Sequence, residues 1–139
     1  MGADLYIEKM DREKQYRGFE VSDEAVEAGY FRDCYNSSGL FAVMSETLDR
    51  KVSWWLMANQ VGLNKKGVLP LANVKVWKAA MQPIIKEFIS RPVLYYKDYE
   101  KGKTEIPAKD AQEYRDWARR LERLMELAIE KESGIIWSV

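Results

Sequence analysis

Histidine is absent from the sequence and cysteine occurs only once, so several classes of catalytic site are excluded. Without histidine, the chain cannot form a Ser-His-Asp or Cys-His catalytic set or a zinc site with imidazole ligands. Cys34 has no second cysteine with which to form an intramolecular disulfide or a thiolate metal cluster. Acid–base catalysis would depend on Asp, Glu, Lys or Tyr side chains whose pKa values are shifted by burial. We therefore expect neither a metal nor a cofactor.

The chain also lacks net charge and long apolar runs. Its 22 basic and 22 acidic residues cancel, so no overall field attracts nucleic acid or anionic lipid. No segment approaches the length that spans a membrane, and the N-terminus has no apolar signal region. Tyr6 stands where an N-myristoylation motif requires Ser or Thr. Together with an unpaired cysteine, these features predict an unlipidated cytoplasmic protein with no membrane partner.

The 139 residues are enough for one domain with a substantial buried core. Hydrophobic residues make up 47% of the chain and charged residues 32%, as is typical of a globular protein. At the N-terminus, Ala3, Leu5 and Ile7 alternate with more polar residues, which predicts a half-buried strand. After Gly134, residues 135–139 are too few for a helix and also predict a strand. We expect these two strands to pair, because neither is stable alone.

Helical signals fill most of the chain between these strands. Ser22 is a predicted N-cap followed by two acidic residues, and the first helix is expected to run to about Tyr35. A second helix begins at Leu40 and either continues to about Asn59 or breaks near Val52 and restarts. We favour the break, because serine is a better cap for the aromatic run that follows than an interior helix residue.

Wide apolar stripes predict two further helices. The third extends over residues 73–91, with a kink or a restart at Pro83, and the last and strongest over residues 107–132. Residues 93–106, between them, are read as the longest loop. The sequence thus predicts a mainly α fold, a single helical domain with a small bundle of four or five helices. A short two-stranded ribbon of the N- and C-terminal segments closes it.

Residues 29–41 and the Trp-Trp pair that follows concentrate aromatic side chains near an Arg-Asp pair. Aromatic walls with a few polar groups are typical of small-ligand sites. The same side chains also suit a buried core in which Arg32 and Asp33 bond to other elements of the fold. We favour this core over a ligand site. Asp4 is expected to cap a helix or pair with Arg32, the alternative being a buried catalytic acid. The candidate binding residues are Tyr30, Arg32, Asp33, Tyr35, Asn36, Trp54 and Trp55.

Tyrosines and lysines alternate over residues 95–103, as in proteins that bind single-stranded nucleic acid. The acidic Asp98, Glu100 and Glu105 nearly balance the basic residues of this tract. A solvated loop whose tyrosines cover the helices is therefore the favoured interpretation, and we do not expect nucleic acid as a partner.

Three blocks resemble a group of small uncharacterised proteins from phages and bacterial genomes. These blocks are Met1 to Ile7, Gly29 to Asn36, and Ser53-Trp54-Trp55. The resemblance implies a phage or prophage origin and a setting in a bacterial or phage-infected cell, and it implies no mechanism.

The leading functional hypothesis is a non-enzymatic accessory or protein-interaction module that binds another protein, one form of which is a homodimer formed through exposed aromatic groups. Its first rival is a small-molecule binder or enzyme that uses Arg32, Asp33, Tyr35 and Asp4. The second rival is a weak single-strand nucleic-acid binder that uses the tyrosine-lysine tract.

Overall fold

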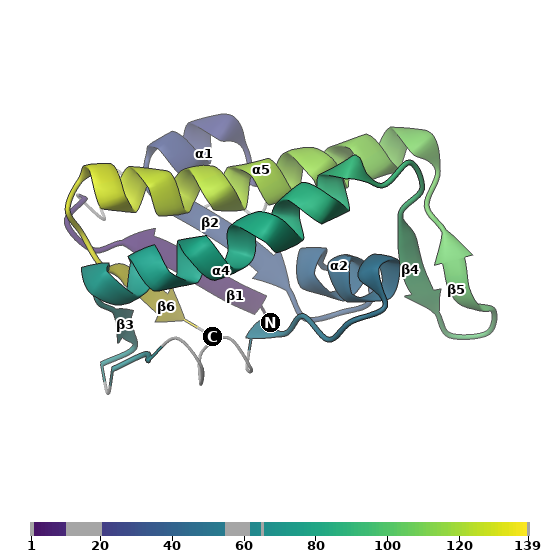
Figure 1. Cartoon of the computed structure of the whole chain (residues 1–139), viewed down its shortest axis with the longest axis horizontal. Coiled ribbons are helices and arrows are strands. Elements are labelled where there is room, and N and C mark those ends of the chain that lie inside the picture. The colour runs from purple at the N-terminus through teal and green to yellow at the C-terminus, as the bar shows by residue number, and fades with distance from the viewer. Residues whose placement is uncertain (1, 11–20, 55–61, 65, 139) are drawn as a thin grey trace.

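The structure is a computed structural model that describes residues 2–10, 21–54, 62–64 and 66–138. Within these ranges the fold is mixed α/β, so the predicted mainly α bundle is wrong (Figure 1). The elements in chain order are β1 (Gly2–Ile7), α1 (Asp23–Glu27), β2 (Tyr30–Cys34), α2 (Leu40–Leu48), β3 (Val68–Leu69), α4 (Leu71–Ser90), β4 (Tyr95–Asp98), β5 (Gly102–Glu105), α5 (Ala108–Glu130) and β6 (Ile135–Ser138).

A four-stranded antiparallel sheet has the strand order β2-β1-β6-β3. The two terminal strands pair as the sequence predicts, with Leu5 opposite Trp137. They form the centre of a sheet and not an isolated ribbon, because β2 extends β1 on one side and β3 extends β6 on the other. The predicted alternation on β1 is confirmed, since Ala3, Leu5 and Ile7 are all fully buried.

The first predicted helix is too long, because its second half is the strand β2. Ser22 caps α1 as expected, accepting a hydrogen bond of 3.1 Å from the Ala25 amide. Helix α1 then ends at Glu27, and Gly29 has a φ of 92°, in the left-handed region that glycine enters without strain. This turn reverses the chain so that β2 lies beside β1, and the Gly29 carbonyl accepts a hydrogen bond from Ile7.

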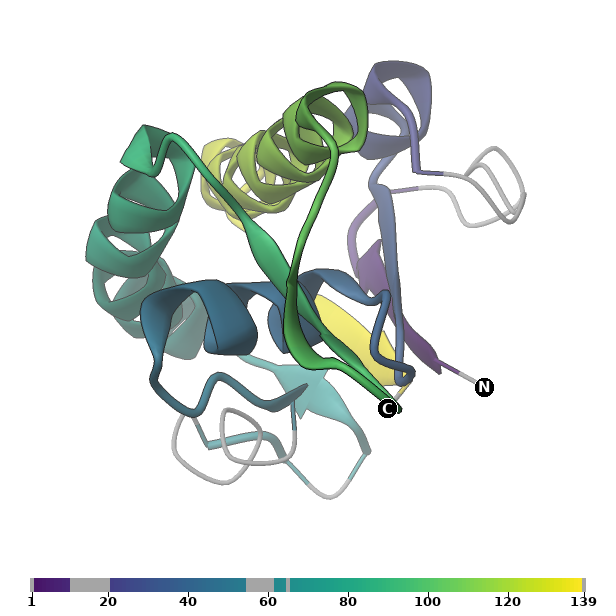
Figure 2. The ribbon, with the colours of Figure 1, turned by 90° about the vertical axis from the view of Figure 1, so that its right-hand side faces the viewer.

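The long helices α4 and α5 lie side by side and cover one face of the sheet (Figures 1 and 2). Helix α1 packs on the outer side of α5, next to β2 (Figure 2). Helix α4 is continuous across Pro83, so the predicted restart there does not occur. Helix α5 supplies Ala118, Leu121, Leu124 and other buried residues to the core beneath it, as its apolar stripe predicts. None of the helices in the described ranges is long and apolar enough to cross a membrane.

The predicted loop between the two long helices is instead the antiparallel hairpin β4–β5. Its turn is closed by Asp98, whose Oδ1 accepts hydrogen bonds from the amides of Glu100 and Lys101. The hairpin leaves one end of the α4–α5 layer, and β4 packs against α2 (Figure 1). Helix α2 ends at Leu48, which agrees with the favoured break near Val52. The alternative of one helix continuing to Asn59 is wrong, because residues 49–53 are not helical; residues 55–59 lie outside the described ranges.

Candidate functional site

Asp33 links the edge strand β2 to the N-terminus of α2. Its side chain points into the core and is fully buried. The N-cap residue of α2 is Gly39, which has no side chain to cap the helix, and a Cβ atom there would overlap the carbonyl oxygen of Cys34. Asp33 supplies the missing cap from another element: its carboxylate accepts hydrogen bonds from the amides of Leu40 (2.7 Å) and Phe41 (3.1 Å).

Two further donors complete the surroundings of this carboxylate. The Cys34 amide donates to Oδ1 at 2.8 Å, and the indole nitrogen of Trp54 donates to Oδ2 at 2.7 Å. Burial raises the pKa of the Asp33 carboxyl above its usual range, and these four hydrogen bonds act in the opposite direction. Because each oxygen receives two N–H donors, Asp33 has little capacity left for a substrate. Asp33 therefore has a structural role and links β2 to α2 and to Trp54.

Trp54 belongs to a closed aromatic cluster in the core. Its ring stacks on Phe41 with centroids 4.0 Å apart and planes 7° apart. The rings of Trp77 and Trp137 meet it at centroid distances of 6.2 and 5.4 Å. The Trp54 side chain is buried on all sides, which matches the packing interpretation of this part of the chain. Its neighbour Trp55 lies outside the described residues.

Tyr30 and Arg32 contact Asp4 on the other face of the sheet. The Tyr30 hydroxyl donates a hydrogen bond of 2.6 Å to Oδ1 of Asp4, and Arg32 Nε lies 3.8 Å from the same oxygen. Burial, followed by the hydrogen bond to Asp4, raises the pKa of Tyr30 well above its usual range. Asp4 therefore pairs with Arg32, which is one of the structural roles expected for it.

Tyr35 and Asn36 lie in the exposed turn after β2. The Tyr35 side chain is 41% exposed. The Asn36 side-chain oxygen accepts hydrogen bonds from the amide and the hydroxyl of Ser38, which fixes the turn. The described candidate residues are therefore divided among a buried core, the outer face of the sheet and a turn, and of these only Arg32 and Asp33 border the same cavity, the cleft described next.

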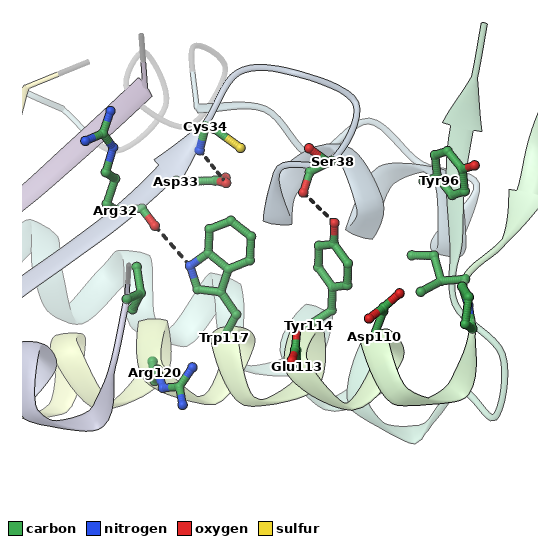
Figure 3. A pocket seen from close by; sticks show the side chains of 13 residues that line it. Arg32, Asp33, Cys34, Ser38, Tyr96, Asp110, Glu113, Tyr114, Trp117 and Arg120 are labelled. Carbon is green, nitrogen blue, oxygen red and sulfur yellow. Dashed lines mark hydrogen bonds between the residues drawn. The ribbon is translucent and has the colours of Figure 1, made fainter. Parts of the chain in front are cut away.

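An open cleft of about 890 Å³ lies between β2 and α5 (Figure 3). The β2 side contributes Arg32, Asp33 and Cys34. The α5 side contributes residues spaced by three or four positions, which places them on one face of the helix. The base of the hairpin and the segment before α1 complete the lining. The remaining lining residues are Val21, Ser38, Tyr96, Ile106, Pro107, Asp110, Glu113, Tyr114, Trp117 and Arg120.

Two hydrogen bonds join the walls of the cleft (Figure 3). The indole nitrogen of Trp117 donates to the Arg32 carbonyl at 3.0 Å, while the Arg32 guanidinium points away from Trp117. The Tyr114 hydroxyl donates to the Ser38 carbonyl at 2.6 Å. Burial raises the pKa of Tyr114 to about 12, assisted by the nearby charges of Cys34 and Asp33. The two rings are thus held in place before any ligand arrives.

The charged groups of the cleft differ in how far they are neutralised. Arg120 forms an ion pair of 2.9 Å with Asp23. Among the described residues, Asp110 and Glu113 have no ion-pair partner, and both are exposed at the rim. The Cys34 thiol is half-buried and lies near Ser38 in the cleft (Figure 3), and burial together with the Asp33 charge raises its pKa.

The sequence predicted α5 from its wide apolar stripe, and Tyr114 and Trp117 were not among the candidate binding residues. The relevant signal was the pattern of Asp110, Glu113, Tyr114 and Trp117 at i, i+3, i+4 and i+7. That pattern mixes acids with aromatics on one face, which is unusual for a simple core stripe. The pattern on α5 does not by itself predict a cleft, because β2 supplies the opposite wall.

No family model matches the chain, and neither a curated protein nor a solved structure matches it. Within the described ranges, no group of three or more Cys, Asp or Glu side chains is arranged to hold a metal ion. The function proposed below is therefore argued from the geometry of the cleft.

Proposed function

We propose that the protein is a non-enzymatic interaction module that binds a segment of a partner protein in the cleft between β2 and α5. The observation that carries this proposal is the cleft itself, with a volume of about 890 Å³ and two ordered aromatic rings on one wall. Aromatic side chains are enriched where proteins bind one another, because they supply a large contact area at low entropic cost.

The length of the cleft suits an extended polypeptide. Its α5 wall runs from Asp110 to Arg120, which corresponds to about 15 Å at the rise of an α-helix. A fully extended chain covers this distance with about four or five residues. Residues at the rim are exposed, so a longer chain could enter and leave the cleft without a terminus at either end. The volume also lies within the range of small-molecule pockets, and it is the exposed rim that favours a segment of a protein over an enclosed metabolite.

Catalysis by the residues of the rival hypothesis has less support. Asp33 already receives four hydrogen bonds, and the Arg32 guanidinium points out of the cleft toward Asp4. Tyr35 lies in an exposed turn. A general acid or base must reach its substrate with a free proton or lone pair. Binding requires no such group.

The hairpin β4–β5 offers less to nucleic acid than its sequence suggests. The Lys103 Nζ lies over the ring of Tyr95 on the paired strand, 4.9 Å from the ring centroid. It also forms an ion pair of 2.9 Å with Asp49. Tyr99, at the turn, is the fully exposed tyrosine of the hairpin. One fully exposed ring makes a poor stacking platform, and one of the three lysines of the tract is already paired with an acid.

The proposal includes a cytoplasmic setting and a phage or prophage origin. The motivation for the setting is the unpaired Cys34, and that for the origin is the resemblance of the three sequence blocks.

The only cysteine of the chain allows a direct test, because Cys34 lines the cleft. A displayed library of random peptides is selected on the native protein and counter-selected on protein whose Cys34 carries a bulky maleimide adduct. The Cys34→Ser variant, exposed to the same maleimide, controls for reagent effects. Peptides that bind native protein and the treated Cys34→Ser variant, but not the adduct, support the proposal. A selection that yields no adduct-sensitive peptide contradicts it.

A further inference from the structure

We propose that the segment bound in the cleft carries a lysine or arginine next to an apolar side chain. The cation would lie between the carboxylates of Asp110 and Glu113 and the ring of Tyr114. This inference rests on the proposed function and specifies the chemistry of its partner.

The first argument is the charge that the cleft leaves uncompensated. The cations on its lining are already paired: Arg120 with Asp23 at 2.9 Å, and Arg32 with Asp4 at 3.8 Å. The buried carboxylate in the opposite wall is bonded to four N–H donors. Within the described chain, the carboxylates of Asp110 and Glu113 remain without an ion-pair partner, so the free charge of the lining is negative. A cationic partner would neutralise it.

Helix stabilisation accounts for only one of these two acids. Asp110 lies in the first turn of α5, where the helix dipole favours a negative charge. Glu113 lies beyond the first turn, where this effect has largely decayed. The pair is three residues apart on one helix face, so the two carboxylates are close enough to contact a single ammonium or guanidinium group.

The aromatic rings beside the acids supply the second argument. Tyr114 lies four residues from Asp110 on the same face of α5, so its ring is a neighbour of the acidic rim. The rings of Tyr114 and Trp117 have centroids 5.9 Å apart and planes 32° apart, and their hydrogen bonds to the opposite wall fix both of them. A cation near the face of such a ring gains cation–π stabilisation. The apolar area of the same rings accepts the neighbouring apolar side chain.

The third argument is the arrangement along the groove. The acids lie at the hairpin end, near Tyr96 and Pro107, and Trp117 lies one to two helical turns further along α5. A cation at one end and an apolar group at the other match this order. A segment with acidic residues would meet repulsion at the hairpin end.

The test uses peptides from the adduct-sensitive selection, synthesised with a fluorophore, and measures their affinity by fluorescence anisotropy. We expect lysine or arginine to be enriched beside an apolar residue in these peptides. The double variant Asp110→Asn/Glu113→Gln should weaken binding by roughly three- to tenfold, because two exposed ion pairs are lost. The matched variant Glu24→Gln/Glu122→Gln makes the same charge change outside the cleft and should leave the affinity unchanged. Raising the salt concentration should weaken binding to the native protein and have little effect on the double variant.

The outcomes separate the inference from the proposed function. Adduct-sensitive peptides without basic residues, or with equal affinity for native protein and the Asp110→Asn/Glu113→Gln variant, overturn the inference while the cleft remains a binding site. Equal weakening by both double variants also overturns it, because a general charge effect would then explain the loss. Concentration-dependent self-association that the peptides do not displace would identify a second copy of the chain as the occupant and overturn it as well. Absence of any adduct-sensitive peptide contradicts the proposed function itself.

Discussion

The buried carboxylate of Asp33 accepts a hydrogen bond of 2.7 Å from the indole nitrogen of Trp54. This contact joins the edge strand β2 to the segment that follows α2, and the same carboxylate caps the first turn of α2. One side chain thus fixes three parts of the chain relative to one another. It also fixes the β2 wall of the cleft, because its neighbours Arg32 and Cys34 line that cavity.

Replacing this carboxylate should destabilise the protein strongly. In Asp33→Asn, an amide group would face N–H donors that now point at an oxygen, and the buried negative charge would be lost. We expect the free energy of unfolding to fall by about 2–4 kcal/mol, since hydrogen bonds to charged groups are among the strongest. Urea denaturation monitored by circular dichroism measures the change. The exposed Asp49→Asn is the control, and an equal effect of the two substitutions would contradict the structural role of Asp33.

The stabilising effect of the Trp54 N–H donor can be separated from that of its aromatic ring. Trp54→Phe keeps an aromatic group against Phe41 but removes the N–H donor to Asp33. We expect a loss of about 1.5–3 kcal/mol. In a double-mutant cycle with Asp33→Asn, the losses should be non-additive by at least about 1 kcal/mol, because the two residues are in contact. Additive losses would show that the hydrogen bond contributes little.

Sequence reasoning located both central strands of the sheet, the N-cap of α1 and the long helices α4 and α5. It failed at β2 for a specific physical reason. Phe31 and Asp33 point to the same face of that strand, so a buried charged residue interrupts the apolar alternation that identifies strands. The spacing of Val26, Tyr30 and Cys34 imitates a helix, and only the left-handed turn at Gly29 separates the two elements.

The hairpin β4–β5 was missed because neither of its faces is strongly apolar. Its residues are half-buried or exposed throughout, so the local pattern resembles a solvated loop. The cleft was missed because it depends on tertiary pairing. Trp117 and Tyr114 reach the Arg32 and Ser38 carbonyls across 85 and 76 residues of sequence, and no local pattern reports such contacts.

Stability should fall at alkaline pH because two tyrosines have raised pKa values in the folded protein. Tyr114 has a pKa of about 12 in the folded protein, against an ordinary tyrosine value of 10.0, and the pKa of Tyr30 is also raised. Between these pH values the unfolded chain loses the proton first, so raising the pH favours unfolding. The stabilising contribution is complete below pH 10 and is lost toward pH 12.

This linkage is measured by urea denaturation at a series of alkaline pH values. Tyr114→Phe should reduce the slope of stability against pH in this range, while Tyr99→Phe, at a fully exposed ring, should not. An unchanged slope in Tyr114→Phe would show that the pKa of the Tyr114 hydroxyl is not raised in the folded protein.

Cys34 should react slowly with alkylating reagents at neutral pH. Burial and the charge of Asp33 raise the pKa of its thiol, so little of the reactive thiolate is present. We expect the rate of iodoacetamide modification to be lower than that of a free thiol such as glutathione and to rise with pH. Unfolding in urea should restore the rate of a free thiol. A fast reaction of the folded protein at neutral pH would contradict the described surroundings of the thiol.

Locating a bound peptide on the protein tests the proposed role of the cleft most directly. A peptide from the adduct-sensitive selection carries a nitroxide, and paramagnetic broadening is recorded in the amide spectrum of ¹⁵N-labelled protein. The proposal predicts that broadening centres on Cys34, Ser38 and residues 110–117. Broadening centred on the hairpin turn at Tyr99, with these signals unaffected, would contradict it.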